Sequence, residues 1–105
     1  MQDLIIYRKM TSPYARFVRV RDGMVWSDTA QALSLTTAWS ASDVTLTPDN
    51  TYIGGTPVKI PAVLPAGEYD MLIYDAATPA ASDTLVIGKR IHWSGNQLIG
   101  LPIEL

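Results

Sequence analysis

Apolar and polar residues alternate in short runs along this chain, and prolines or glycines interrupt the runs after a few positions. No window shows apolar residues at the helical spacing of about three to four positions. Proline fits poorly inside a helix because it lacks the backbone N–H and clashes with the preceding turn. The pattern therefore predicts an all-β chain of short antiparallel strands.

A β-hairpin is predicted in the first quarter of the chain. Residues 14–21 alternate as one strand, and Asp22-Gly23 is a residue pair typical of a tight hairpin turn. The chain then returns along residues 24–26. For residues 29–33 the sequence leaves open a continued strand or a short helical turn. Further strands are expected over residues 3–9, 43–47, 58–60, 68–75, 84–93 and 97–101.

The strand predicted over residues 84–93 contains an irregularity. Lys89 interrupts an apolar face, and a β-bulge beside Gly88 would restore the alternation. The apolar residues of that face are Leu85, Ile87, Ile91 and Trp93.

Residues 64–69, with the sequence LPAGEY, combine a tight turn with a tyrosine early in the following strand. This is the pattern of a tyrosine corner, which marks the start of strand F in immunoglobulin-like sandwiches. We expect the Tyr69 hydroxyl to bond to the backbone a few residues upstream and its ring to be buried. Gly67 and Trp93 are the other predicted structural residues. The strands and the corner together predict an immunoglobulin-like β-sandwich of about seven to eight short antiparallel strands.

Residues 1–13 are predicted to be an N-terminal strand or an extended assembly arm, ahead of a β-sandwich domain at residues 14–105. The arm contains a continuous apolar run that needs cover on both faces, and Ser12-Pro13 would let it leave its own domain. Such a strand pairs with the sheet edge of another copy or another protein. The alternative is an ordinary first strand, because termini are often tied into sheets. The predicted interface residues are Leu4, Ile5, Ile6, Tyr7, Arg8, Arg19 and Arg21.

Composition limits the possible partners. The chain has 105 residues, of which 48% are hydrophobic and 17% charged, so it fits one domain with one modest core. The formal net charge is −2, which provides no global basic field to attract nucleic acid. Residues 1–21 nevertheless carry +4 and the remainder −6. Arginines in the basic part would therefore meet the acidic surface of a partner, such as a neighbouring copy.

The chain has no cysteine, which excludes disulfides, thiolate metal sites and cysteine nucleophiles. Its apolar runs are far shorter than the about 20 residues of a membrane-spanning helix. The N-terminus also lacks the pattern of a signal peptide. The sequence predicts a soluble protein made in a cytoplasm, with no membrane partner.

The chemistry-bearing side chains do not assemble into a catalytic motif. In the densest acidic group, Glu68 and Asp70 alternate outward on a strand. Asp75 and Asp83 bracket a loop where aspartate caps turns. Calcium-loop spacing is absent from this group. His92 is the single histidine, no nucleophile or metal motif accompanies it, and it is expected at the surface. We predict no enzymatic activity, no metal and no cofactor. The acidic group consists of Glu68, Asp70, Asp75 and Asp83.

The three tryptophans and five tyrosines raise a carbohydrate-binding alternative, because sugars stack on exposed aromatic faces. Most of these aromatic residues are expected in the core of a small sandwich. Trp39, in the polar stretch 36–42, is the one predicted to be exposed. A carbohydrate-binding β-sandwich with Trp39 as its ligand contact is therefore the alternative function.

Several segments, taken in order, resemble small β-sandwich modules of tailed-phage and prophage virion proteins. The resemblance covers most of residues 14–101 and implies a non-enzymatic structural protein of a capsid, neck, tail or fibre. It further implies self-assembly into a homo-oligomer, contacts with other virion structural proteins, and localisation to the virion after assembly in the host bacterial cytoplasm. The matching segments are RVRDGMVW at 19–26, LPAGEYDMLIYD at 64–75, DTL at 83–85 and WSG at 93–95.

Overall fold

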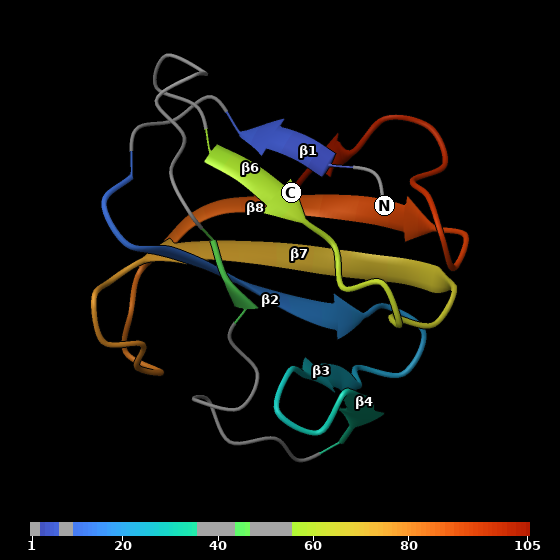
Figure 1. The fold of residues 1–105 in the computed structure, drawn as a ribbon, viewed down its shortest axis with the longest axis horizontal. Helices are drawn as coiled ribbons and strands as arrows, with labels where there is room; N and C mark the ends of the chain where they lie inside the picture. Colours follow the sequence, from blue (N-terminus) through green and yellow to red (C-terminus); the bar gives the residue numbers. More distant parts are fainter. Residues whose placement is uncertain (1–2, 7–9, 36–43, 47–55) are drawn as a thin grey trace.

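The computed structural model describes residues 3–6, 10–35, 44–46 and 56–105. Every regular element in these ranges is a β-strand, and the strands pair antiparallel, which confirms the all-β prediction (Figure 1). Within them there is no helix with the length and apolarity that a membrane crossing requires. The strands are β1 (Asp3–Ile6), β2 (Pro13–Arg19), β3 (Val25–Ser27), β4 (Ala32–Ser34), β5 (Val44–Thr45), β6 (Thr56–Lys59), β7 (Gly67–Asp75), β8 (Leu85–Trp93) and β9 (Ile103–Glu104).

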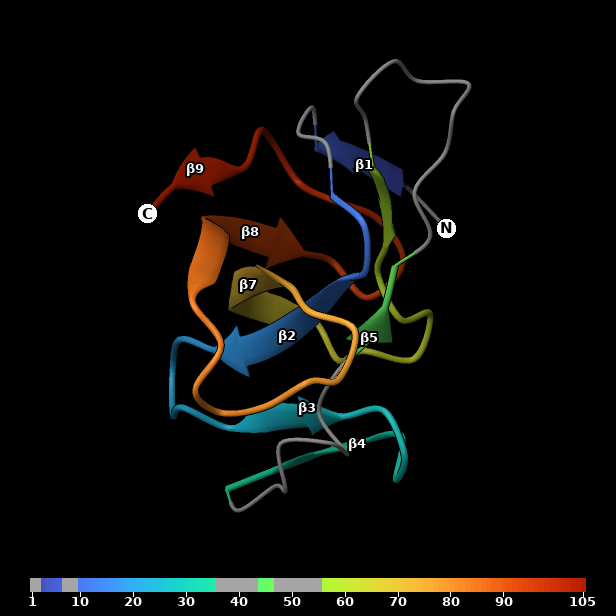
Figure 2. The same cartoon turned by 90° about the vertical axis from the view of Figure 1, so that its left-hand side faces the viewer.

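The strands form a small sheet and a large sheet. β1 pairs with β6 in the two-stranded small sheet. The seven-stranded large sheet has the order β4-β3-β2-β7-β8-β9, and β5 pairs with the beginning of β2. In Figure 2, β1 and β6 lie on one side of β2, β7 and β8, whereas β9 and the C-terminus lie toward the other side. The large sheet therefore has one face toward the small sheet and one face away from it.

One core joins buried residues of the large sheet to residues of the β6 segment and of the connecting loops. Alternate residues of β2, β7 and β8 point inward, and Val58 and Ile60 from the β6 segment pack against them. Tyr69, Met71 and Ile73 share the buried face of β7, which confirms the alternation predicted for that strand. The buried cluster comprises Met10, Ala15, Phe17, Trp26, Leu46, Val58, Ile60, Leu64, Tyr69, Met71, Ile73, Ile91 and Trp93.

The predicted hairpin joins β2 to β3. Gly23 takes a φ of +73°, which glycine adopts without steric cost, and its N–H donates to the Arg19 carbonyl at 2.8 Å. The Arg19 N–H donates in turn to the Met24 carbonyl at 2.7 Å. The Asp22 carboxylate accepts from the Met24 N–H at 3.1 Å. The hairpin prediction is confirmed, but its turn is longer than expected: β2 ends at Arg19 instead of Arg21, and residues 20–23 form the loop.

The segment after β3 forms a turn followed by a strand. The Gln31 N–H donates to the Ser27 carbonyl at 2.8 Å, and Gln31 adopts a φ of +56°. β4 then runs back along β3, with Ala32 opposite Ser27. The two alternatives left open for residues 29–33 are thus both partly realised, as a tight turn that leads into an antiparallel strand.

The position of the predicted β-bulge was wrong. Ile73 lies opposite Ile87, but Tyr74 lies opposite Leu85, so Val86 is the extra residue. Leu85 consequently leaves the face shared by the other apolar residues of β8.

Lys89 keeps the regular register, opposite Met71. Its ammonium group donates to the Glu104 carboxylate of β9 at 2.8 Å. Glu104 of the edge strand therefore neutralises the ammonium group of Lys89. Lys89 fits the regular ladder without a β-bulge beside Gly88.

The N-terminal strand pairs within its own chain. Leu4 lies opposite Val58, and Ile5 opposite Pro57, in the antiparallel β1–β6 ladder. This pairing corresponds to the ordinary first strand that the sequence left as an alternative to an assembly arm. Tyr7 and Arg8, which were predicted as interface residues with Leu4, Ile5 and Ile6, lie outside the described residues.

Candidate functional site

The turn that precedes β7 is fixed by two buried aromatic side chains. The Tyr69 hydroxyl donates to the Pro65 carbonyl at 2.7 Å, and Trp93 Nε1 donates to the Leu64 carbonyl at 2.9 Å. The bond and the buried ring confirm the geometry predicted for Tyr69. Gly67 follows with a φ of +153°, a conformation that side-chain-bearing residues rarely adopt. Successive carbonyls of this turn are thus satisfied by core side chains, which holds the start of β7 in one position.

Next to this turn lies a surface hollow of about 320 Å³, which we call the polar hollow. It lies where β2 leaves the sheet, and the Val20 N–H donates to the Glu68 carbonyl at 3.0 Å. The hollow brings together two predicted interface arginines, Arg19 and Arg21, with His92 from the end of β8. Its lining consists of Arg19, Val20, Arg21, Ala66, Gly67, Glu68 and His92.

Arg19 is committed to the adjacent hairpin. Its Nε and one terminal nitrogen donate to the two carboxylate oxygens of Asp22 at 3.0 and 2.7 Å. This bidentate contact lowers the pKa of Asp22 to about 2 and raises the pKa of Arg19. The charge of Arg19 is therefore balanced inside the molecule.

The Arg19–Asp22 pair predicts an acid-dependent loss of stability. The pKa of Asp22 falls from 3.8 to about 2 on folding, so the folded state favours the charged carboxylate. The resulting stabilisation is complete above about pH 4 and disappears as the pH falls through about 2. We expect Asp22→Asn to lower the unfolding midpoint at neutral pH and to flatten its decline in acid. Chemical denaturation from neutral to acidic pH measures this, and superimposable pH profiles of the two proteins would contradict it.

Three other polar side chains of the hollow remain available to a partner. The Arg21 side chain is 77% exposed and forms a long ion pair with Asp22, at 3.9 Å, so it shares that carboxylate with Arg19. Glu68 and His92 are exposed and form no hydrogen bond or close ion pair within the described ranges, although Arg90, which pairs with Asp70, also attracts Glu68 electrostatically. The hollow thus carries an accessible cation and an accessible anion.

An exposed apolar row begins beside the hollow. The Ile99 N–H donates to the His92 carbonyl at 2.8 Å, and the chain continues along the edge of the sheet to β9. This edge strand lies later than the strand expected over residues 97–101, where Leu98 forms only an isolated bridge to Trp93. The apolar row consists of every second residue of the C-terminal segment: Ile99, Leu101, Ile103 and Leu105, which are 51%, 91%, 65% and 58% exposed.

The end of the row is seated against Gly88 in β8. A Cβ atom at position 88 would lie 3.2 Å from Leu105 Cδ1, so the missing side chain makes room for Leu105. The Lys89–Glu104 ion pair holds the same strand in register. The apolar row is therefore a positioned part of the sheet edge.

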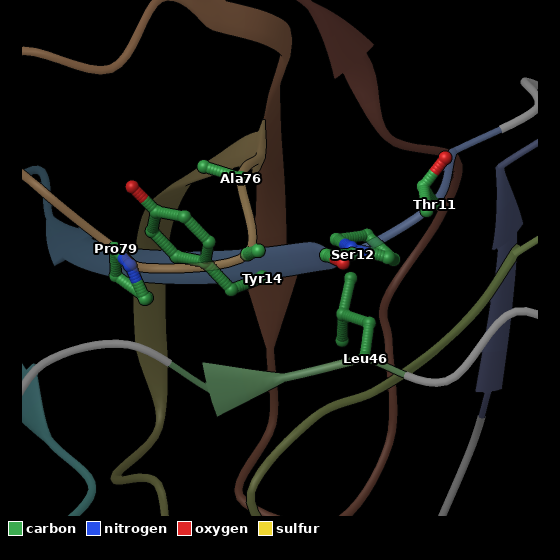
Figure 3. A pocket seen from close by; sticks show the side chains of 8 residues that line it. Thr11, Ser12, Tyr14, Leu46, Ala76 and Pro79 are labelled. Atoms are coloured by element: carbon green, nitrogen blue, oxygen red, sulfur yellow. The ribbon is translucent and has the colours of Figure 1, made fainter.

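A second pocket, of about 340 Å³, lies between the beginning of β2 and the loop after β7 (Figure 3). The Tyr14 side chain lies between Ala76 and Pro79 in this view, with Leu46 on the opposite side of β2. No charged residue is among the described residues that line it, and its polar side chains are the hydroxyls of Thr11, Ser12 and Tyr14. Its lining consists of Thr11, Ser12, Pro13, Tyr14, Leu46, Ala76, Ala77 and Pro79.

The acidic group considered for catalysis is dispersed. Asp70 accepts from Arg90 at 2.8 Å on the outward face of the large sheet. Asp83 accepts from the Ala80 N–H at 3.0 Å, the turn-capping role predicted for it. The Asp75 carboxylate accepts from the backbone N–H groups of Thr11 and Ser12, so it fixes the start of β2. The part of the chain that the structure describes contains no cluster of metal-ligating side chains.

The described aromatic residues do not form a sugar platform. Trp26 and Trp93 are fully buried in the core. Tyr14 and Tyr74 stack on each other with ring centroids 5.2 Å apart, and both are buried. Trp39, the predicted ligand contact, lies outside the described residues.

No protein-family model matches this chain, and no curated protein or solved structure is significantly similar to it.

The sequence interpretation missed the apolar row and the polar hollow. The row was visible as large aliphatic residues at every second position near the C-terminus, although Gly100 and Pro102 stand between them. The hollow had no local signal, because Arg21 and Glu68 belong to distant parts of the chain that meet only in the folded sheet.

Proposed function

We propose that this protein is a non-enzymatic structural component of a tailed-phage or prophage virion, acting through protein–protein contacts and self-assembly. The observation that carries the proposal is the apolar row on the edge of the large sheet. Four large aliphatic side chains, each more than half exposed, follow one another in the C-terminal segment, where Ile103 in β9 pairs with β8 and the Leu105 N–H donates to the Gly88 carbonyl at 3.0 Å. Contiguous exposed apolar surface of this kind marks interaction sites in soluble proteins.

The finer fold proposed is an immunoglobulin-like β-sandwich. The tyrosine corner at the start of β7 supports it, because the hydroxyl of Tyr69 bonds to the backbone upstream as in that fold. A core that joins buried residues of the large sheet to the β6 segment of the smaller sheet agrees with a two-layer architecture.

Attachment to virus particles tests the proposal. The protein should be present in gradient-purified particles, and Leu101→Asp with Ile103→Asp should reduce its incorporation at least about tenfold, because each buried aliphatic contact at an interface centre contributes about 1 kcal/mol or more. Immunoblots of particles, made in a host that lacks the native gene and carries the variant, measure the incorporation.

Val63→Asp is the matched control, because Val63 is a 60% exposed aliphatic residue outside the row. This variant should enter particles normally. Absence of the wild-type protein from purified particles, or equal incorporation of the row variant and the control, would contradict the proposed function.

A further inference from the structure

We infer that the polar hollow and the apolar row form one self-complementary surface, through which two copies of this chain pair about a two-fold axis. In this pair Arg21 of each copy faces Glu68 of the other. The inference rests on the proposed function, of which it names one partner, a second copy of the chain.

The charges of the hollow favour a second copy as the occupant. An accessible arginine and an accessible glutamate border the same hollow and form no ion pair with each other. A partner that is purely acidic would be repelled by Glu68, and a purely basic one by Arg21. A partner that carries the same pair in the opposite orientation satisfies both charges, which is the arrangement a two-fold axis produces.

The ion pair of Arg19 shows which charges of the hollow can select a second copy as the partner. The Arg19 guanidinium is already held by both oxygens of Asp22, which Arg21 reaches at 3.9 Å, so the three groups together leave one net positive charge, and Arg21 is the more exposed of the two arginines. Asp22 is shared by two arginines and Arg90 by two carboxylates, so one net positive and one net negative charge remain, and Arg21 and Glu68 are the exposed members that can select the partner. Their equal and opposite charges also argue against a polyanion such as nucleic acid, which needs an excess of cations.

The apolar row is continuous with the hollow. Ile99 is bonded through its backbone to His92, which lines the hollow, and Leu101 and Ile103 continue along the edge of the sheet. In a two-fold interface the same patch is used by both copies, so an apolar row covers an apolar row. The surface thereby combines an apolar part with charged groups that fix orientation, which is the usual composition of a specific interface.

The first step of the test is charge reversal, measured by sedimentation equilibrium. Arg21→Glu and Glu68→Arg, each alone, should raise the dimer dissociation constant at least about tenfold, because both reciprocal pairs become repulsive. The double variant R21E/E68R should return the constant to within about threefold of the wild type, because the same pairs reform with reversed polarity. An equimolar mixture of the two single variants should form a heterodimer.

The matched control is Thr78→Asp with Ser82→Asp. These exposed residues lie in the loop between β7 and β8, outside the proposed surface, and the double change alters net charge as much as Arg21→Glu does. The control should dimerise like the wild type. Unfolding midpoints of all variants establish that they are folded.

The outcomes separate this inference from the proposed function. A wild-type chain that stays monomeric at about 1 mM overturns the inference, since a dimer with a dissociation constant above this value is too weak to be a specific assembly. Single variants that dimerise normally, or a double variant that is not rescued, also overturn it. Incorporation into particles is measured independently, so the proposed function stands or fails on that experiment whatever the dimer equilibrium shows.

Discussion

Replacement of Trp93 by alanine should remove about 3–5 kcal/mol from the free energy of unfolding. The indole is 1% exposed within the core cluster, so its removal leaves a large cavity lined by residues that cannot all collapse into it. The change also removes the donor that satisfies the Leu64 carbonyl. A domain of this size is stable by about 5–15 kcal/mol, so the variant should be close to unfolded at moderate temperature.

Urea denaturation followed by circular dichroism measures this loss. Trp93→Phe is the matched variant, because it keeps an aromatic ring in the core but removes the N–H donor. Trp93→Phe should lose less unfolding free energy than Trp93→Ala, and the difference between the two variants reports the packing of the aromatic ring. A loss below about 1 kcal/mol for the alanine variant would show that Trp93 does not occupy the core as described.

Tyr69→Phe should destabilise the protein by about 1–2 kcal/mol. The ring stays in place in this variant, but the Pro65 carbonyl loses the hydroxyl that bonds to it at 2.7 Å. The thermal midpoint or the urea midpoint measures the effect, and an unchanged midpoint would contradict the tyrosine-corner assignment.

The pH dependence of stability, compared between the wild type and the Tyr69→Phe variant, gives a second test of the corner. Burial raises the pKa of the Tyr69 hydroxyl above 10.0. The stabilisation from the protonated hydroxyl is therefore complete below about pH 10 and is lost as the pH rises through the higher pKa of the folded state. The phenylalanine variant should lack this part of the alkaline decline.

Features that depend on neighbouring residues were predictable from the sequence. The β2–β3 hairpin follows from Asp22 and Gly23, because the bonds that close it join residues a few positions apart. The bond of the Tyr69 hydroxyl is local in the same way, since it reaches a carbonyl four residues upstream. The alternation of β7 also persists in the structure, because it separates core from solvent along one strand.

Features that depend on which strands become neighbours were not predictable. The bulge lies at Val86 instead of beside Gly88, and Lys89 pairs with Glu104 of β9, a neighbour that the sequence pattern does not reveal. The polar hollow likewise requires the end of β2 to meet the beginning of β7. A sequence pattern identifies strands and faces, whereas the composition of a surface site follows from the order of strands in the sheet.

The division into two sheets has a consequence for how the molecule opens. The ladder of β1 and β6 joins four residue pairs, and within the described residues it is separate from the hydrogen-bonded network of the large sheet. Release of β1 therefore costs far less than global unfolding, and amide exchange in this ladder reports local opening. Val58 in β6 and Ile60 just after it belong to the buried core, so an opening that also frees β6 would admit water and proteases to core residues while the large sheet stays paired.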